Sequence, residues 1–339
     1  MAILGHYAEL EDWKTAVGNW IYYSGGGGRF RYGRAALYLG TGNAGAFLQD
    51  DWEAGAVTTV CMSTRNYTSS DAFAAASVGR FMGLTDGGSL RLALKGTFAT
   101  GLIKLVTVDG ASEVVLATSA YAPSAYTLQR FDLFVEGYNS ASARVRVWHQ
   151  EGTAAQNLML DYTGDVRVGG STSLDGLWRT GHSATNPSDL HCFSETFVAD
   201  VATTRMGLRT FYPNAAGDVN DFDTGAYTDV DEITADTSNF CESGTAGQRF
   251  LFGQTDFAGG ITERVLSVQV TALAARGDTG PANMNLGIKS GTTEDWGPDI
   301  PLDVAYAGHR RLMAVDPTDS APWDQDKVNA LQAGAKSVT

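Results

Sequence analysis

The side chains best suited to bind a metal ion crowd into one acidic stretch in the second half of the chain. Within fifteen residues the sequence places seven oxygen-bearing side chains: Asp218, Asn220, Asp221, Asp223, Asp229, Asp231 and Glu232. Calcium takes about six to eight oxygen ligands, so Asp218, Asp221 and Asp223 are the candidate ligands of a calcium site. The spacing lacks the glycine and the distal glutamate of an EF-hand loop. A solvated acidic face, or charges that guard a strand edge, would explain the same residues.

Two tryptophans are candidates for contact with a glycan or a partner protein. Trp148 and Trp178 lie in segments with strand character, where an aromatic ring on an outward face can stack on a sugar or pack at an interface. Packing in the core is the alternative for each ring.

No group of residues has the spacing of a catalytic or cofactor site. None of the histidines stands at metal-ligand spacing from another or beside an activated nucleophile: His6, His149, His182, His191 and His309. The three cysteines, Cys61, Cys192 and Cys241, are far apart and form no CxxC pair, so we interpret them as small buried residues rather than zinc ligands. The sequence therefore predicts no catalytic residues, no cofactor and no enzyme.

Charge and hydropathy exclude two classes of partner. The net charge is −14, and residues 217–339 contribute −11 of it through 19 acidic and 8 basic side chains. An acidic surface repels phosphate backbones, which argues against nucleic-acid binding. No apolar run approaches the length of a membrane span, and the opening MAILGHYAELEDW has no signal-peptide pattern. We therefore expect no membrane insertion and no signal peptide.

The elements that would position such residues are mainly β-strands, and residues 130–150 form the clearest pair. Phe131, Leu133 and Val135 alternate with polar or outward residues, and a Gly-Tyr-Asn-Ser turn follows. After the turn, we expect Arg144, Arg146 and His149 on one face and Val145, Val147 and Trp148 on the other, with a slip of phase at the end of the strand. This pattern predicts an antiparallel hairpin with one buried face. Asp109-Gly110 predicts a second hairpin turn.

Glycine, serine and threonine separate short runs of β-branched and aromatic residues throughout the chain, which predicts an all-β fold. The length predicts two domains, residues 1–215 and 216–339. Residues 214–217 form the expected linker. Strands in the second half are expected at 248–253, 265–275, 284–290, 303–306 and 311–315. The end of the chain, residues 321–334, predicts a helix with Pro322 in its first turn and Gly334 at its C-terminal cap.

The order of motifs in the first domain resembles a known fold family. The AALYL strand, the RFDLFVEG-turn-RVRVWHQEG hairpin and the FSETFVAD strand follow one another as in concanavalin-like, laminin-G-type jelly-roll sandwiches. The resemblance covers about residues 25–215. It implies a lectin-like β-sandwich. Glycosidases of that superfamily carry an E-x-D-x-E type strand, and Ser194–Asp200 has a different spacing, so the resemblance does not extend to the catalytic branch.

The second half resembles the C-terminal part of virion proteins of tailed bacteriophages. The resemblance rests on Thr228–Asp236, on VLSVQVTALAARGDTGPANMNLGIKSGTT and on the PWDQDKVNALQAGAKS tail. It implies a smaller β-sandwich closed by the terminal helix, and a structural protein of the virion, made in the host cytoplasm. The implied partners are other virion proteins, copies of the chain itself and a host surface glycan.

Three functional hypotheses stay open at this point. The first is a non-enzymatic component of the tail, baseplate or fibre, with a capsid decoration or head-fibre protein as its close alternative. The second is a secreted carbohydrate-binding or glycan-cleaving protein, which predicts two carboxylates about 5–10 Å apart on one sheet face. The third is an adhesion module stabilised by calcium.

Overall fold

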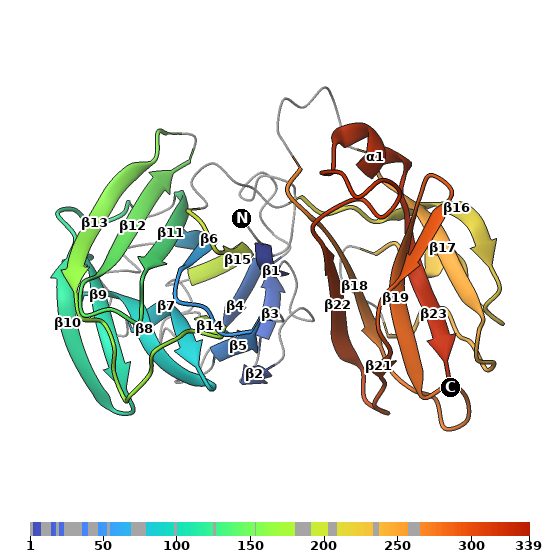
Figure 1. The fold of residues 1–339 in the computed structure, drawn as a ribbon, viewed down its shortest axis with the longest axis horizontal. Helices are drawn as coiled ribbons and strands as arrows, with labels where there is room; N and C mark the ends of the chain where they lie inside the picture. The colour runs from blue at the N-terminus through green and yellow to red at the C-terminus, as the bar shows by residue number, and fades with distance from the viewer. Residues whose placement is uncertain are drawn as a thin grey trace. The chain divides into compact units, whose positions relative to one another are not determined.

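The chain divides into two compact units, Met1–Leu208 and Arg209–Thr339, which are described separately (Figure 1). The computed structural model describes residues 3–7, 15–17, 20–23, 36–39, 47–52, 55–68, 79–97, 100–124, 127–152, 154–179, 191–202, 209–232, 237–256 and 265–339. The predicted boundary after residue 215 falls inside a strand, whereas the compact units divide after Leu208.

The first unit consists of two antiparallel sheets. Sheet A has eight strands, in the order β13-β12-β11-β6-β15-β4-β3, with β1 also paired to β15. Its strands are β1 (Ile3–Tyr7), β3 (Trp20–Tyr23), β4 (Ala36–Leu39), β6 (Val60–Thr68), β11 (Leu128–Glu136), β12 (Ala143–Glu151), β13 (Asn157–Gly164) and β15 (His191–Ala199). Sheet B has seven strands, in the order β10-β9-β8-β7-β14-β5-β2. They are β2 (Thr15–Val17), β5 (Phe47–Asp51), β7 (Arg80–Asp86), β8 (Ser89–Gly96), β9 (Ile103–Asp109), β10 (Ser112–Thr118) and β14 (Gly176–Arg179).

The core of the first unit consists of apolar residues from both sheets. Sheet A contributes Val60, Met62, Phe131, Leu133, Val135, Val145 and Val147, and sheet B contributes Phe81, Met82, Leu84, Leu92, Leu94 and Leu105. The Phe81 and Phe131 rings meet edge to face across the two sheets, with centroids 5.3 Å apart. Alternate residues of each strand point to opposite sides of its sheet, so the period-two pattern of the sequence fixes which residues enter this core.

Both predicted hairpins are confirmed, and one detail of the first is wrong. β9 and β10 are joined through Asp109-Gly110, where Gly110 has a φ of +57° that favours glycine. β11 pairs with β12 without any irregularity, from Gln129 opposite Glu151 to Glu136 opposite Arg144. The expected slip of phase is absent because this regular pairing holds the alternation to the end of the strand. His149 therefore lies on the core side, 2% exposed, and Trp148 lies on the outer face.

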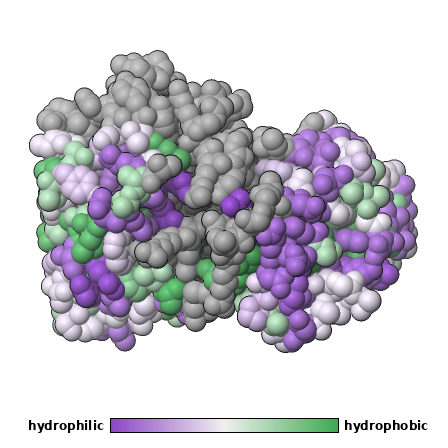
Figure 2. Space-filling model, turned by 90° about the horizontal axis from the view of Figure 1, so that it is seen from above, coloured by the Kyte–Doolittle hydropathy of each residue, from purple (hydrophilic) through white to green (hydrophobic). Residues whose placement is uncertain are grey.

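The second unit combines a six-stranded sheet with a two-stranded one. The larger sheet has the order β16-β17-β23-β19-β20, with β21 also paired to β19, and β18 pairs with β22. The strands are β16 (Pro213–Asn220), β17 (Arg249–Gln254), β18 (Val268–Ala274), β19 (Asn283–Ser290), β20 (Thr293–Trp296), β21 (Ile300–Pro301), β22 (Ala307–Met313) and β23 (Gln332–Val338). The 3-10 helix η2 covers Tyr227–Asp229 and the α-helix α1 covers Gln325–Ala330. At the right of Figure 2, hydrophilic residues make up most of this unit's visible surface.

The end of the chain corrects the predicted terminal helix. Only Gln325–Ala330 is helical, and the Asp324 side chain caps it by accepting a hydrogen bond of 2.9 Å from the Lys327 N–H. Leu331 is already extended, and Gln332–Val338 forms β23, which lies between β17 and β19. Long-range pairing in the sheet overrides the helical preference of this segment. No described helix has the length and apolar character that a membrane crossing requires.

Two further predictions in the second unit are wrong. Residues 214–217 belong to β16 rather than to a linker, because this strand shifts register twice against β17 and so lacks a clean alternation. Residues 303–306 are not a strand, because pairing with β18 starts only at Ala307.

Gly334 allows β23 to pack in the middle of the sheet, and we expect its replacement by alanine to unfold or strongly weaken the second unit. A Cβ at this position would lie 1.8 Å from the carbonyl oxygen of Phe250. Gly334→Ala should lower the free energy of unfolding by more than about 2 kcal/mol, measured by denaturant titration. Gly277→Ala is the control, because its Cβ would meet nothing closer than 3.7 Å. Equal stability of the two variants would contradict the central position of β23.

Candidate functional site

The outer face of sheet A carries a row of polar and aromatic side chains from β11 and β12. Because Phe131, Leu133 and Val135 point into the core, the residues between them point outward. The outward residues of β11 and their partners on β12 are Arg130 with Gln150, Asp132 with Trp148, Phe134 with Arg146 and Glu136 with Arg144. The hairpin register therefore brings side chains of both signs and two aromatic rings onto one face of the sheet, where Phe134 is 5% exposed and Arg146 and Trp148 are partly exposed.

Phe134, Arg146 and Trp148 form the arginine–aromatic cluster of this surface. The Phe134 and Trp148 ring centroids are 6.1 Å apart, and the two rings are tilted by 32°. The Arg146 guanidinium carbon lies 5.0 Å from the Phe134 centroid and 5.1 Å from the Trp148 centroid. Both are cation–π distances. Arg146 also donates a hydrogen bond to the Glu136 carboxylate, which fixes its orientation over the rings.

A buried ion pair supports the cluster from the neighbouring positions. Arg130 donates to Asp132 with bonds of 2.9 and 3.2 Å, and the two residues are 5% and 0% exposed. The Gln156 amide donates to the other oxygen of Asp132, and the Arg130 guanidinium lies 5.4 Å from the Phe197 ring centroid. A buried charge without a partner is costly, so loss of either Arg130 or Asp132 would leave the other as an uncompensated buried charge.

At the rim of the same face, Arg144 and Asp161 form an exposed pair with two hydrogen bonds of 3.0 and 2.7 Å. The hydrogen bonds from Arg144 lower the pKa of Asp161, so this carboxyl remains charged and paired at neutral pH. Exposed pairs of this kind add little stability, but they set the charge pattern that a partner would meet.

The two predicted tryptophans do not share a site. Trp148 is half-buried on the outer face of sheet A. Trp178 is on β14 of sheet B, between Leu177 and Arg179, which are both 0% exposed. Strand alternation therefore puts Trp178 on the outer face of sheet B. The two rings lie on opposite sides of the sandwich.

The candidate calcium ligands are not brought together. Among the residues that the structure describes, no three histidine, cysteine, aspartate or glutamate side chains are grouped to hold a metal ion. Asp218 accepts a hydrogen bond from Lys289, which lowers the pKa of its carboxyl. Asp223 accepts from the Gln248 amide and from the Gly244 N–H, each at 2.7 Å. Asp221 uses its backbone N–H to bond the Arg249 carbonyl at 2.8 Å.

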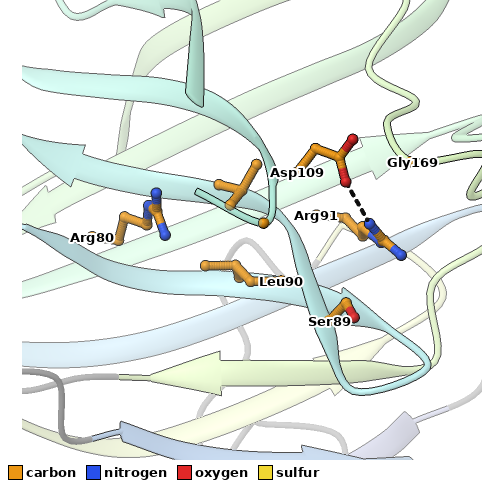
Figure 3. Close-up of a pocket in the computed structure, with 8 residues that line it drawn as sticks. Arg80, Ser89, Leu90, Arg91, Asp109 and Gly169 are labelled. Atoms are coloured by element: carbon orange, nitrogen blue, oxygen red, sulfur yellow. Dashed lines mark hydrogen bonds and ion pairs between the residues drawn. The ribbon is translucent and has the colours of Figure 1, made fainter. Parts of the chain in front are cut away.

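A pocket of about 450 Å³ is a second place where a ligand would find polar groups (Figure 3). It is lined by Arg80, Ser89, Leu90, Arg91, Val108, Asp109, Gly110 and Gly169. Arg80 and Arg91 lie on opposite sides of Leu90, and Arg91 is 3.4 Å from the Asp109 carboxylate. At the other end Arg80 and Lys95 share the single carboxylate of Glu113. The pocket therefore combines donors, an acceptor and an apolar wall.

His149, which faces the core of the first unit, forms a close contact with Tyr121, which is 36% exposed. The Tyr121 hydroxyl and His149 Nδ1 are 3.2 Å apart, and the His149 ring lies 4.8 Å from the Phe131 ring centroid. Burial lowers the pKa of His149 to about 4, so the imidazole is neutral at physiological pH. Burial also raises the pKa of Tyr121. The pair is therefore a neutral hydrogen bond at the edge of the core.

This burial predicts a pH dependence of stability. The unfolded His149 binds a proton below about 6.5, whereas the folded one does so only below about 4. Between these values the unfolded chain holds more protons, so the stability of the first unit should rise with pH, by at most about 3 kcal/mol. His149→Gln should flatten this rise in urea titrations at pH 4.5 and 7. His309→Gln, in the second unit, is the control and should leave the slope of the first unit unchanged. An unaltered slope in His149→Gln would refute the assignment.

Sequence reasoning missed most of the row of polar and aromatic side chains on the outer face of sheet A. Strict alternation from Phe131 to His149 would have put Phe134, Arg146 and Trp148 on one face, and the expected phase slip concealed it. The Arg130–Asp132 spacing of two residues also places both side chains on one face of a strand. Their burial depends on contacts far away in the chain, which no local pattern shows.

No family model matches the chain, and no curated protein matches its sequence. Solved structures match its fold. The globular domain of T. cruzi calreticulin is 10% identical, with a TM-score of 0.40, over 60% of this chain and 90% of that one. The endo-β-1,4-glucuronan lyase of Trichoderma reesei is 10% identical, with a TM-score of 0.43, over 58% and 95%. Arcelin-5 of Phaseolus vulgaris, a lectin-like defence protein, is 10% identical, with a TM-score of 0.38, over 57% and 96%.

The first unit is a sandwich of two antiparallel sheets. The predicted all-β class is confirmed by the antiparallel sheets of the structure. At these identities and TM-scores the similarity carries no argument about activity or ligand.

Proposed function

We propose that the chain is a non-enzymatic structural protein of a tailed bacteriophage virion, and that its lectin-like unit binds partners through the outer face of sheet A. The observation that carries the binding role is the arginine–aromatic cluster of Phe134, Arg146 and Trp148. Tryptophan and arginine dominate the binding energy of protein interfaces, because each contributes a large, rigid contact area with a polar group. The virion setting is supported by the sequence pattern of residues 228–236 and of the tail from Pro322.

The partners in this proposal are other virion proteins, copies of the chain itself and a host surface glycan. Several copies on one particle would multiply a weak contact by valency, so a modest affinity for each site is sufficient. The position is the tail, the baseplate or a fibre. Immunogold labelling of purified particles with an antibody to the chain tests this setting directly. Label on the head would favour a decoration role, and particles without label would refute the virion proposal.

We expect the Trp148→Ala variant to lose binding. Removal of an interface tryptophan costs about 2 kcal/mol, or roughly thirty-fold in Kd. The measurement is binding of the labelled chain to purified particles and to a glycan array, with Trp178→Ala as the matched control on the opposite sheet. The thermal melting of both variants checks that they fold.

Binding by Trp148→Ala at the affinity of the unchanged chain would contradict the role of the cluster. Release of shortened oligosaccharides from an array glycan would contradict the non-enzymatic proposal. Binding to glycan but not to particles would favour a carbohydrate-binding protein outside the virion.

A further inference from the structure

The outermost strand of sheet B has an open edge. β10 is the end strand of that sheet, and within the described strands it pairs with β9 alone. Figure 1 shows it at the outer left, beside β13, which is the end strand of sheet A. Half of the backbone N–H and C=O groups of an edge strand point away from its sheet, so such a strand is a template for another strand.

The side chains at this edge are apolar and exposed. Val114 is 58% exposed and Val115 is 46% exposed. These two residues are consecutive, so they extend to opposite sides of the strand and leave both sides apolar. Burial of such side chains would stabilise a complex.

The charges at the edge permit a second copy to approach. Soluble proteins commonly protect edge strands with lysine or proline, and β10, SEVVLAT, contains neither. Its one charged residue is Glu113, whose carboxylate bonds Arg80 at 3.0 Å and Lys95 at 2.7 Å. Two copies of β10 would therefore meet without an unpaired like charge on each strand.

We propose that β10 pairs antiparallel with β10 of a second copy of this chain, so that two copies of sheet B join into one continuous sheet. An identical strand is the natural occupant, because an antiparallel pair about a two-fold axis matches each N–H with a C=O and can place Val114 opposite Val114 of the other copy. The register of β10 against β9 shifts between Val115 and Ala117. This bulge bends the strand beyond Val115, so the pairing is centred on Val114, with Val115 opposite Glu113 of the other copy. A two-fold contact closes on itself and yields a dimer rather than a fibre.

This inference deepens the proposed structural role by naming one contact between copies. Its test uses the purified full-length chain and no particles, so it can fail while the virion proposal stands. Trp148→Ala should dimerise normally, because its ring lies on the outer face of the other sheet.

The experiment is sedimentation velocity over a concentration series, combined with hydrogen exchange. We expect the unchanged chain to dimerise and its β10 amides to become protected as concentration rises. Val114→Lys brings two like charges together across the axis, and it should weaken association at least roughly tenfold and release those amides. Val304→Lys, at a 67% exposed position of the second unit, is the control and should dimerise normally.

Val115→Glu is a second variant at the edge, for use if Val114→Lys melts at a lower temperature than the unchanged chain. A monomer at every concentration would overturn the proposal. So would dimers of folded Val114→Lys and Val115→Glu with unchanged affinity, or a dimer whose β10 amides exchange as fast as those of the monomer.

Discussion

The register between β11 and β12 is the constraint on which the first unit depends. It directs Phe131, Leu133 and Val135 into the core, and it places the arginine–aromatic cluster on the opposite face. Because side chains alternate with a period of two, a slip of one residue would exchange the two faces. The core would then receive Arg130 and Asp132, and the outer face would receive Phe131, Leu133 and Val135 in place of the buried ion pair and Phe134. The same pairing therefore specifies both the core and the arginine–aromatic cluster.

The second unit depends on the end of the chain. β23 lies between β17 and β19, so the middle of the larger sheet forms only when the last residues are in place. A glycine also makes the close contact between the end strand β16 and β17, because a Cβ at Gly217 would lie 1.8 Å from the Leu251 carbonyl oxygen. Trp323, Val328 and Leu331 pack under this sheet and connect the short helix to it. Of the acidic side chains that the structure describes in this unit, Asp316 alone is buried, which suits a unit whose surface is solvated and carries most of the net charge.

The sequence predicted those parts of the fold that local patterns determine. Alternation gave the β11–β12 hairpin, and Asp109-Gly110 gave the turn between β9 and β10. Prediction from the sequence failed where pairing with a strand far away in the chain decides the local structure. We predicted residues 331–334 as the end of a helix, yet β17 and β19 pair with residues 332–334 as a strand. For the candidate site, the sequence analysis named Trp148 as a contact residue but did not name its neighbours Phe134 and Arg146. The expected phase slip had assigned Trp148 to the wrong face of the strand.

The central claim is that the face of β12 with Arg144, Arg146 and Trp148 points outward. Cysteine scanning tests it most directly, in a chain whose native cysteines are replaced by alanine. Single cysteines at positions 144, 145, 146 and 147 would be treated with a thiol reagent under native conditions. Our account predicts reaction at 144 and 146 and protection at 145 and 147, where Val145 and Val147 are 0% exposed. The reverse pattern, or equal reaction at all four positions, would contradict it.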